Sequence, residues 1–355
     1  MPGLQTAPKN SPSSIGVLRW QPLSCLDVLC ELQSPLESVL ERAELLLGAR
    51  RSTPDSPFYS FPESQFAQRW RVTRDESLAF TSEEKARPWC VENLVSGATL
   101  HCKNHQQALT SIEYATVQAL VDQVKSDPVK SATENHRSVD SVFALHGALL
   151  CKNGFGIVVF GPSESGKSTL SCALWQNGWS LLSDDFCFFQ NENRAFPAPR
   201  RVSLRGGSRA LIGEEIWARI QNAPSSFQTE EGWLFHPHEL EAESAAPDAR
   251  AGGVLVQAFV FLGRRRSEAT SVFLQRHNPA LAAMAILPYC TLLPRVEDGL
   301  NATILTAAGV LDWGAALPRI APVAARVPVY DLGRGPLPEM IAAVETLTAR
   351  PKETP

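Results

Sequence analysis

The sequence has no long apolar run and no excess of positive charge. No uninterrupted apolar stretch approaches the roughly 18 to 20 residues that a transmembrane helix requires, and residues 1–16 lack the basic-then-apolar order of a signal peptide. We therefore expect a cytoplasmic protein without a membrane partner. The 33 basic and 37 acidic residues give a formal charge of −4, so no global positive field favours nucleic acid as a partner.

The sequence also has no C-x-x-C pair, although eight cysteines are scattered along it. Several of them lie inside apolar runs, where a free cysteine behaves as a small buried hydrophobic residue. We expect reduced, mostly buried thiols, as is usual inside the cell. What is present is ordinary for a soluble globular protein: 44% hydrophobic and 20% charged residues over 355 positions, enough for two domains.

The N-terminal part predicts a small α+β domain over residues 15–138, between a flexible tail at 1–14 and the next domain. Ser34, Pro35 and Glu37 resemble a capping box, and apolar residues then follow at helical spacing, which predicts a helix at 34–47. A second helix is predicted at 111–125. Strand patterns occur at 70–74 and within 89–102, with a turn at Ser96-Gly97.

The most informative stretch is a phosphate-binding pattern, G-x-x-x-x-G-K-[ST], directly after an apolar strand at 155–160. Its nine residues are Gly161, Pro162, Ser163, Glu164, Ser165, Gly166, Lys167, Ser168 and Thr169. A helix is expected at 168–177, with Gly178 as its C-terminal glycine. The order strand, loop, helix favours a nucleotide phosphate site over an accidental glycine-rich turn.

Each residue type in this pattern has a chemical reason. Backbone N–H groups of such a loop bind phosphates, Lys167 would reach the β and γ phosphates, and the Ser168 hydroxyl can ligate Mg²⁺. The expected cofactors are therefore ATP and Mg²⁺.

A pair of carboxylates, Asp184 and Asp185, follows a predicted strand at 179–183 and precedes another at 186–189. An acid at this place can hold Mg²⁺ or accept the proton of an attacking hydroxyl. The alternative is an ordinary turn in which the side chains bind the local backbone.

Further strands are predicted at 148–151, 253–262, 271–275 and 327–332, and helices at 278–287 and 338–349. Asn153-Gly154 predicts a two-residue hairpin turn just before the phosphate-binding pattern. Alternating strands and helices place residues 139–350 in the α/β class, and the antiparallel hairpin predicts a mixed sheet. Residues 351–355 are expected to be a flexible tail.

Over residues 144–190 the chain resembles the catalytic domain of the HPr kinase/phosphorylase group, and more closely the related serine kinases that tailor lasso peptides. The resemblance is carried by Leu145-His146-Gly147-Ala148, the Asn153-Gly154 turn, the loop and the run W-S-L-L-S-D-D-F. It implies a P-loop catalytic domain of the HPr kinase/phosphoenolpyruvate carboxykinase-like type. Its activity would be transfer of the γ-phosphoryl group of ATP to a serine hydroxyl.

Carried over residue by residue, the resemblance implies that Asp184 is the catalytic base, Asp185 assists the metal, and His146 stands beside the site with Lys167. The chain also departs from the HPr-specific pattern, because Glu164 replaces a glycine and residues 202–207 echo the second signature only weakly. HPr is therefore a doubtful substrate.

Three weaker features complete the candidates. Arg200, Arg201 and Arg205 could stabilise phosphoryl charge, with Arg205 the predicted nucleotide contact, or could form a solvated loop. His236 and His238 offer two imidazoles, but a surface turn is favoured over a metal site. The run 264–266 is expected to be a charged hairpin tip.

The leading hypothesis is an ATP- and Mg²⁺-dependent kinase whose phosphoacceptor is a serine of a peptide or protein. A small-molecule hydroxyl kinase and a nucleotide-dependent regulatory switch or ATPase remain alternatives. The sequence leaves open the acceptor, the role of residues 15–138 and the oligomeric state, including a homo-oligomer.

Overall fold

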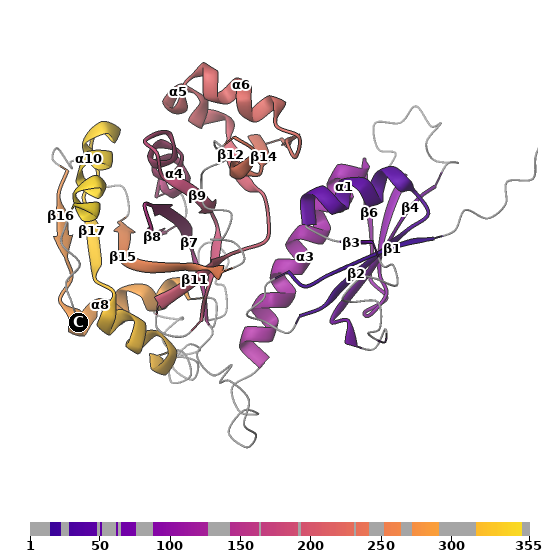
Figure 1. Ribbon diagram of the computed structural model, residues 1–355, viewed down its shortest axis with the longest axis horizontal. Helices are drawn as coiled ribbons and strands as arrows, with labels where there is room; N and C mark the ends of the chain where they lie inside the picture. The colour runs from indigo at the N-terminus through magenta and orange to yellow at the C-terminus, as the bar shows by residue number, and fades with distance from the viewer. Residues whose placement is uncertain are drawn as a thin grey trace, which may run out of the picture. The chain divides into compact units, whose positions relative to one another are not determined.

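The chain forms two compact units, and the division between them falls inside the helix labelled α3 (His105–Ser126) in Figure 1. In this computed structural model, the first unit holds the described residues up to Thr116 and the second those from Val117 onward. The described residues are 15–22, 28–47, 50–51, 62, 65–75, 88–126, 143–162, 165–190, 193–230, 232–240, 252–263, 272–290 and 317–349. The two predicted tails, and the predicted hairpin tip at 264–266, lie outside them.

The first unit is built on a six-stranded sheet in the order β3-β1-β2-β4-β5-β6. Its elements are β1 (Gly16–Trp20), β2 (Cys30–Ser34), α1 (Glu37–Leu47), β3 (Arg50–Arg51), β4 (Gln68–Arg74), β5 (Trp89–Asn93), β6 (Thr99–Cys102) and the start of α3 (His105–Ser126). The pairing of β2 with β4 is parallel, and the other pairings are antiparallel. The predicted α+β character of this part is therefore present.

Alternation along the strands separates a core face from a polar face in this sheet. Leu18, Leu32 and Val72 are fully buried. On the other face, the buried carboxylate of Glu31 lies between Arg19, at 2.9 Å, and Arg69, at 3.1 Å. The charge of Glu31 is thus compensated from both neighbouring strands, as a buried carboxylate requires.

Both predicted helices of this unit begin elsewhere than expected. Ser34 ends β2, where its hydroxyl donates to the Val72 carbonyl at 2.9 Å and accepts from the Leu36 N–H at 3.1 Å, and α1 begins at Glu37. Helix α3 begins at His105, well before the predicted residue 111, because the Asn104 side chain accepts from the Gln107 N–H at 2.8 Å. An Asn cap in a polar stretch gives little hydrophobic periodicity and was overlooked.

The second unit contains a mixed sheet in the order β11-β10-β7-β8-β15-β17-β16, with β9 also paired to β7. The strands are β7 (Phe143–Lys152), β8 (Phe155–Phe160), β9 (Ser180–Ser183), β10 (Phe186–Gln190), β11 (Arg194–Pro197), β15 (Val254–Leu262), β16 (Leu274–Arg276) and β17 (Val329–Leu332). Strand β15 is parallel to both β8 and β17, whereas β7 and β8 are antiparallel. The predicted mixed α/β sheet is confirmed.

Helices cover both faces of this sheet, so the second unit has three layers (Figure 1). Ile157 and Val159 of β8 pack with helices α4 (Lys167–Gln176) and α10 (Leu337–Thr348). Val158 and Phe160 point the other way and pack with α8 (Pro279–Ile286) and with the helical residues 317–326. A strand buried on both faces reads as a continuous apolar run, as β8 does.

Two turns lead into and out of the α4 region as the sequence predicts. Asn153 and Gly154 have φ of 51° and 77°, the positive values that a two-residue hairpin turn needs. After α4, Gly178 has φ of 83°, and the N–H groups of Gly178 and Trp179 donate to the carbonyls of Trp175 and Leu174. These bonds form a Schellman motif, which ends α4 and starts the next strand.

A small three-stranded sheet, β12-β14-β13, adds to the α4 side of the second unit. Its elements are β12 (Val202–Arg205), α5 (Arg209–Ile212), α6 (Glu214–Asn222), β13 (Phe227–Gln228) and β14 (Gly232–Phe235). Val202, Leu204 and Phe235 belong to the same apolar cluster as α4. This sheet is therefore anchored beside the helix that follows the phosphate-binding pattern.

The cysteines of the described residues are free, and six of these seven are buried, as expected. Burial raises the pKa of the Cys30, Cys172 and Cys187 thiols, which keeps them protonated. No helix of the described ranges is long and apolar enough to cross a membrane.

Candidate functional site

The site is built around β7, which has different partners on its two edges. On one edge it pairs with β8, where Gly147 lies opposite Phe160. On the other edge it pairs first with β10 and then with β9, and the gap between those two strands is Asp184-Asp185. The Gly147 N–H donates to the Asp185 carbonyl at 2.9 Å. Asp185, Gly147 and Phe160 therefore lie side by side across the sheet, and each is separated from the next by one strand spacing of about 4.8 Å.

The loop after β8 requires glycine at two positions. Gly161 has φ of 153°, and a Cβ there would lie 2.3 Å from the Leu262 carbonyl at the end of β15. Gly166 has φ of 88° and precedes the first residue of α4. The strand, loop and helix predicted for 155–177 are therefore present. Ser163 and Glu164 lie outside the described residues, so the orientation of Glu164 stays a prediction.

Lys167 is the first residue of α4 and is buried. Its ammonium donates to the carbonyls of Gly161, at 2.9 Å, and Pro162, at 3.1 Å. Burial lowers the pKa of Lys167, while the charges of Asp185 and Asp184 act in the opposite direction. The lysine thus lies within electrostatic reach of both carboxylates.

Further polar groups lie in the loop and in the first turn of α4. Ser168 and Thr169 follow Lys167 in the first helical turn and are half-buried. No side chain of the described residues caps this turn, so its N–H groups are the positive end of the helix. The Ser165 hydroxyl is buried and has no hydrogen-bond partner among the described residues. Such a loop is suited to an anion.

Asp184 is buried, with 7% of its surface exposed. One carboxylate oxygen accepts from the Ser203 N–H of β12 at 2.9 Å. Burial, and next the charge of Asp185, raise the pKa of Asp184 to about 7, although Arg200 and the Ser203 N–H oppose the shift. A carboxyl group with such a pKa exchanges protons near neutral pH.

Asp185 is held by two side chains. Its Oδ2 lies 2.7 Å from Nη1 of Arg200, and its Oδ1 lies 3.0 Å from Nδ1 of His146. His146 lies in β7 opposite Phe186. The centroids of the two rings are 5.1 Å apart, and the rings meet edge to face. The structure therefore places His146 against Asp185, and the role of His146 in the site stays a prediction. To bind a metal ion as predicted, Asp185 would have to lose its contact with Arg200 or His146, or bind the ion through an oxygen that also contacts one of them.

The three candidate arginines have different partners and different burial in the structure. Arg200 pairs with Asp185, and Arg201 is buried with its guanidinium donating to the Ser225 carbonyl at 3.1 Å. The alternative of a solvated loop is wrong for both. Arg205, the arginine chosen from the sequence, is exposed at the end of β12, and its nucleotide contact stays a prediction.

Arg200 could have been found if the hairpin formed by β10 and β11 had been predicted. In that hairpin Cys187 pairs with Pro197, and continuing the same register by two residues brings residue 199, the neighbour of Arg200, opposite Asp185. The Pro-rich composition of this stretch concealed the strand.

The favoured surface turn at His236 is also wrong. His236 has only 5% of its surface exposed, and its N–H donates to the Ser225 hydroxyl at 2.8 Å. The Ser225 hydroxyl in turn donates to Glu239 at 2.6 Å. Among the described residues no group of three or more His, Cys, Asp or Glu could hold a metal ion. His236 thus belongs to a buried polar cluster.

One residue of the site was missed entirely. The Arg334 guanidinium donates to the Ser165 carbonyl within the loop, from the segment that follows β17. The signal in the sequence was the run Gly333-Arg334-Gly335-Pro336 directly after a predicted strand, a turn with a single charged side chain.

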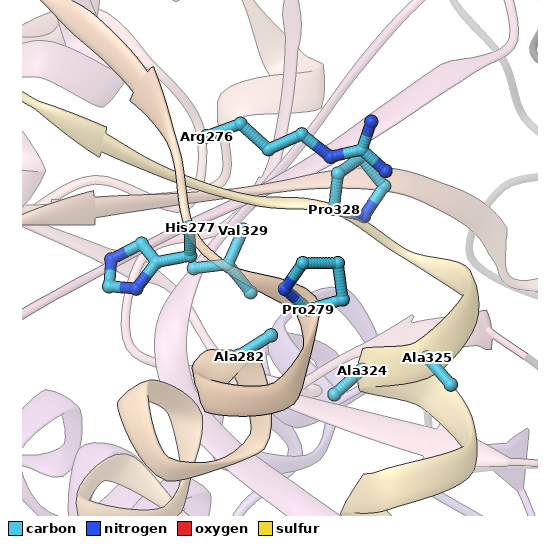
Figure 2. Close-up of a pocket in the computed structure, with 8 residues that line it drawn as sticks. All are labelled: Arg276, His277, Pro279, Ala282, Ala324, Ala325, Pro328 and Val329. Atoms are coloured by element: carbon cyan, nitrogen blue, oxygen red, sulfur yellow. The ribbon is translucent and has the colours of Figure 1, made fainter.

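A pocket elsewhere in the second unit contains none of the predicted site residues (Figure 2). It lies between β16, β17, α8 and the helical residues 317–326, and its lining includes Arg276, His277 and Val329. Val329 pairs with Phe259 and, through it, aligns with Val158 of β8, before the strand reaches the loop. The pocket is therefore not the predicted phosphate site.

Residues of the site could accommodate Mg²⁺ only in part. Mg²⁺ prefers oxygen ligands and is commonly held by one or two carboxylates together with substrate phosphates and water. The Ser168 hydroxyl and the Asp184-Asp185 pair supply that kind of ligand. With no cluster of three such acids among the described residues, phosphate oxygens would have to complete the coordination.

No family model matches this chain, and no curated protein matches it. The second unit is an α/β unit that is characterised by the arrangement of its loop and its carboxylates. In it, a glycine loop with a buried lysine lies across β7 from a carboxylate pair, of which Asp184 is buried and Asp185 half-buried. That description, and the resemblance over residues 144–190, are the basis for the function that follows.

Proposed function

We propose that the protein is a kinase that uses ATP and Mg²⁺ to phosphorylate a hydroxyl, a serine of a peptide or protein. The observation that carries the proposal is Asp184. It is a buried carboxyl group with a pKa raised to about 7, beside a glycine loop whose lysine feels its charge. A general base works best when its pKa is near the working pH.

Each group then has one role. The loop N–H groups and Lys167 bind the phosphates, and their positive charge favours the negative charge of the transferring group. Asp184 accepts the proton of the attacking hydroxyl. Arg200 pairs with Asp185, whose charge helps to raise the pKa of Asp184, and His146 lies against Asp185. Bound Mg²⁺, held by Ser168, Asp185 and the phosphates, would supply charge neutralisation.

We also infer that the second unit has the finer architecture of the HPr kinase/phosphoenolpyruvate carboxykinase-like group. What supports this is the loop after β8 of a mixed sheet, with a carboxylate pair on the far side of β7. The test is an experimental structure with nucleotide bound. An arrangement in which phosphates lie away from the 161–169 loop would contradict both inferences.

The activity test is incubation with γ-labelled ATP, Mg²⁺ and peptides or small proteins encoded beside this chain, followed by mass spectrometry. Label should appear on a serine hydroxyl. Asp184→Asn should bind ATP almost normally and transfer about 10² to 10⁴ times more slowly. The matched control is Asp331→Asn, which changes a carboxylate of the same sheet that lies 2.9 Å from His277.

The outcome that contradicts the kinase is specific. If no acceptor is labelled, while ATP hydrolysis or a nucleotide-dependent shape change persists in Asp184→Asn, the protein is a nucleotide-dependent switch. If free serine or another small hydroxyl compound is labelled and peptides are not, the kinase stands and its acceptor changes.

A further inference from the structure

Arg334 belongs to a short link between two anchored elements of the second unit. The link, residues 333–336, joins the end of β17 to the start of α10. Leu332 before it and Met340 after it are both buried in the cluster that contains α4. The ends of the link are therefore fixed relative to the helix that follows the 161–169 loop.

The link is also fixed by close packing against the residues before β16. The Gly333 N–H donates to the Phe273 carbonyl at 2.8 Å. A Cβ at Gly333 would lie 2.3 Å from the Phe273 ring, and one at Gly335 would lie 2.6 Å from the Val272 side chain. Arg334 is thus the one residue of this tight Gly-Arg-Gly turn that extends a side chain, and its guanidinium reaches Ser165.

The contact has a direct consequence for the loop backbone. The Ser165 carbonyl and the Gly166 N–H belong to one planar peptide group, in which they point in opposite directions. A guanidinium that binds this carbonyl therefore fixes the direction of the Gly166 N–H, on the opposite side of the peptide. It also polarises the peptide, which makes that N–H a stronger donor.

We propose that Arg334 is a positioning residue of the phosphate site, which holds the peptide between Ser165 and Gly166 so that the Gly166 N–H faces the phosphates. The inference rests on the proposed nucleotide function, because it assumes that the loop binds phosphate. It adds a residue from the C-terminal part of the chain to a site that the sequence places at 161–169. The buried Ser165 hydroxyl, without a partner among the described residues, marks the same turn of the loop as built for a ligand.

The contact can be observed at a single amide. The sequence contains two Ser-Gly peptide bonds, 96–97 and 165–166. Labelling serine with ¹³C at the carbonyl and glycine with ¹⁵N therefore selects two amide signals, Gly97 and Gly166. The Gly97 N–H donates to the Asn93 carbonyl in the first unit, and its signal is the internal reference.

The experiment compares wild type, Arg334→Gln, Arg334→Lys and the control Arg276→Gln, first alone and then with Mg²⁺ and inorganic triphosphate. Without ligand, the Gly166 signal should differ between wild type and Arg334→Gln, and Gly97 should not move. Triphosphate should shift Gly166 downfield in wild type and in the control, and much less in Arg334→Gln. Arg334→Lys, which keeps the charge, should restore part of the shift.

Calorimetry adds a functional measurement. Arg334→Gln should weaken ATP and inorganic triphosphate by the same factor, about tenfold or more, as expected for loss of a charge-assisted hydrogen bond. A loss confined to ATP would mean that Arg334 acts on the base or ribose and would overturn the proposal. An unchanged Gly166 signal in Arg334→Gln without ligand would overturn it as well. If wild type binds neither ligand, the proposed function fails, and the ligand-free comparison still tests the contact.

Discussion

At the scale of single residues, Lys167 and Asp184 are both buried ionisable groups, but their surroundings compensate them differently. The Lys167 ammonium donates to two carbonyls of its own loop, so its cost of burial is offset by the backbone. Asp184 has one N–H donor from β12 and a second carboxylate as its neighbour in the chain. The loop carbonyls thus compensate the Lys167 ammonium, whereas the aspartate keeps its proton at unusually high pH.

Replacing Lys167 by alanine should remove most of the affinity for ATP. Losing one member of a desolvated charge pair costs roughly 2 kcal/mol or more, which corresponds to about thirtyfold. Calorimetric titration measures it. The matched control is Lys152→Ala, since this ammonium also binds a backbone carbonyl, that of Asn177 at 2.9 Å, and pairs with Glu345. Equal ATP affinities for Lys167→Ala and wild type would refute the assignment of the loop.

The raised pKa of Asp184 should make folding stability depend on pH. In the unfolded chain the carboxyl group loses its proton near its ordinary pKa of 3.8, but in the folded protein only at about 7. Between those values the folded state binds the extra proton, so stability is present at about pH 4 and falls as the pH rises to about 7. The decline should approach roughly 4 kcal/mol.

The measurement is urea unfolding of wild type and Asp184→Asn across that pH range. Asparagine removes the titration and can still accept from Ser203. The free energy of unfolding of wild type, minus that of Asp184→Asn, should decrease steadily with pH. A difference that does not change with pH would show that Asp184 titrates alike in both states.

At the scale of elements, the sequence was informative where the signal is local. The strand at 155–160, the hairpin turn at Asn153-Gly154 and the glycine after α4 all depend on neighbours in the chain, and all are present. The contacts of Arg200 with Asp185 and of Arg334 with Ser165 join segments far apart in the sequence. Such pairs follow from strand register and packing, which a single sequence does not encode in its periodicity.

The Schellman motif after α4 offers a test at this scale. Gly178→Ala places a Cβ at φ of 83°, although the nearest atom would be 4.0 Å away, so any cost comes from backbone strain alone. We expect a loss of roughly 1 kcal/mol in the free energy of unfolding. Gly207→Ala is the control, because a Cβ there meets nothing within 4 Å and its φ is not positive. Equal stabilities of the two variants would contradict the strain argument.

At the scale of the whole molecule, the two units divide between Thr116 and Val117, inside α3. The domain boundary predicted near residue 138 lies outside the described residues and stays a prediction. The second half of α3 belongs with the second unit, where the Val124 carbonyl accepts from the Arg319 guanidinium at 3.1 Å. One helix is thus shared by two units.

This sharing predicts that a fragment of residues 117–355 is more stable than one of residues 139–355. The shorter fragment loses the helical turn that contains the Val124 carbonyl, and Arg319 loses that acceptor. Thermal unfolding should show a higher Tm for the longer fragment, by about 2–4 °C for each kcal/mol. Identical Tm values would show that this half of α3 adds nothing to the second unit.

The pairing of strand β7 on both of its edges bears on how the second unit can move. The carboxylate pair and the start of the 161–169 loop flank the same residue, Gly147: its N–H donates to the Asp185 carbonyl, and on its other edge it lies opposite Phe160. A Cβ at Gly147 would lie 2.9 Å from the Val159 carbonyl, so the close approach of β7 to β8 at this point requires glycine. We therefore expect the carboxylate pair and the 161–169 loop to keep a constant separation. We expect any opening or closing around a ligand to involve segments outside this sheet, and amide hydrogen exchange should be slowest where β7 and β8 meet.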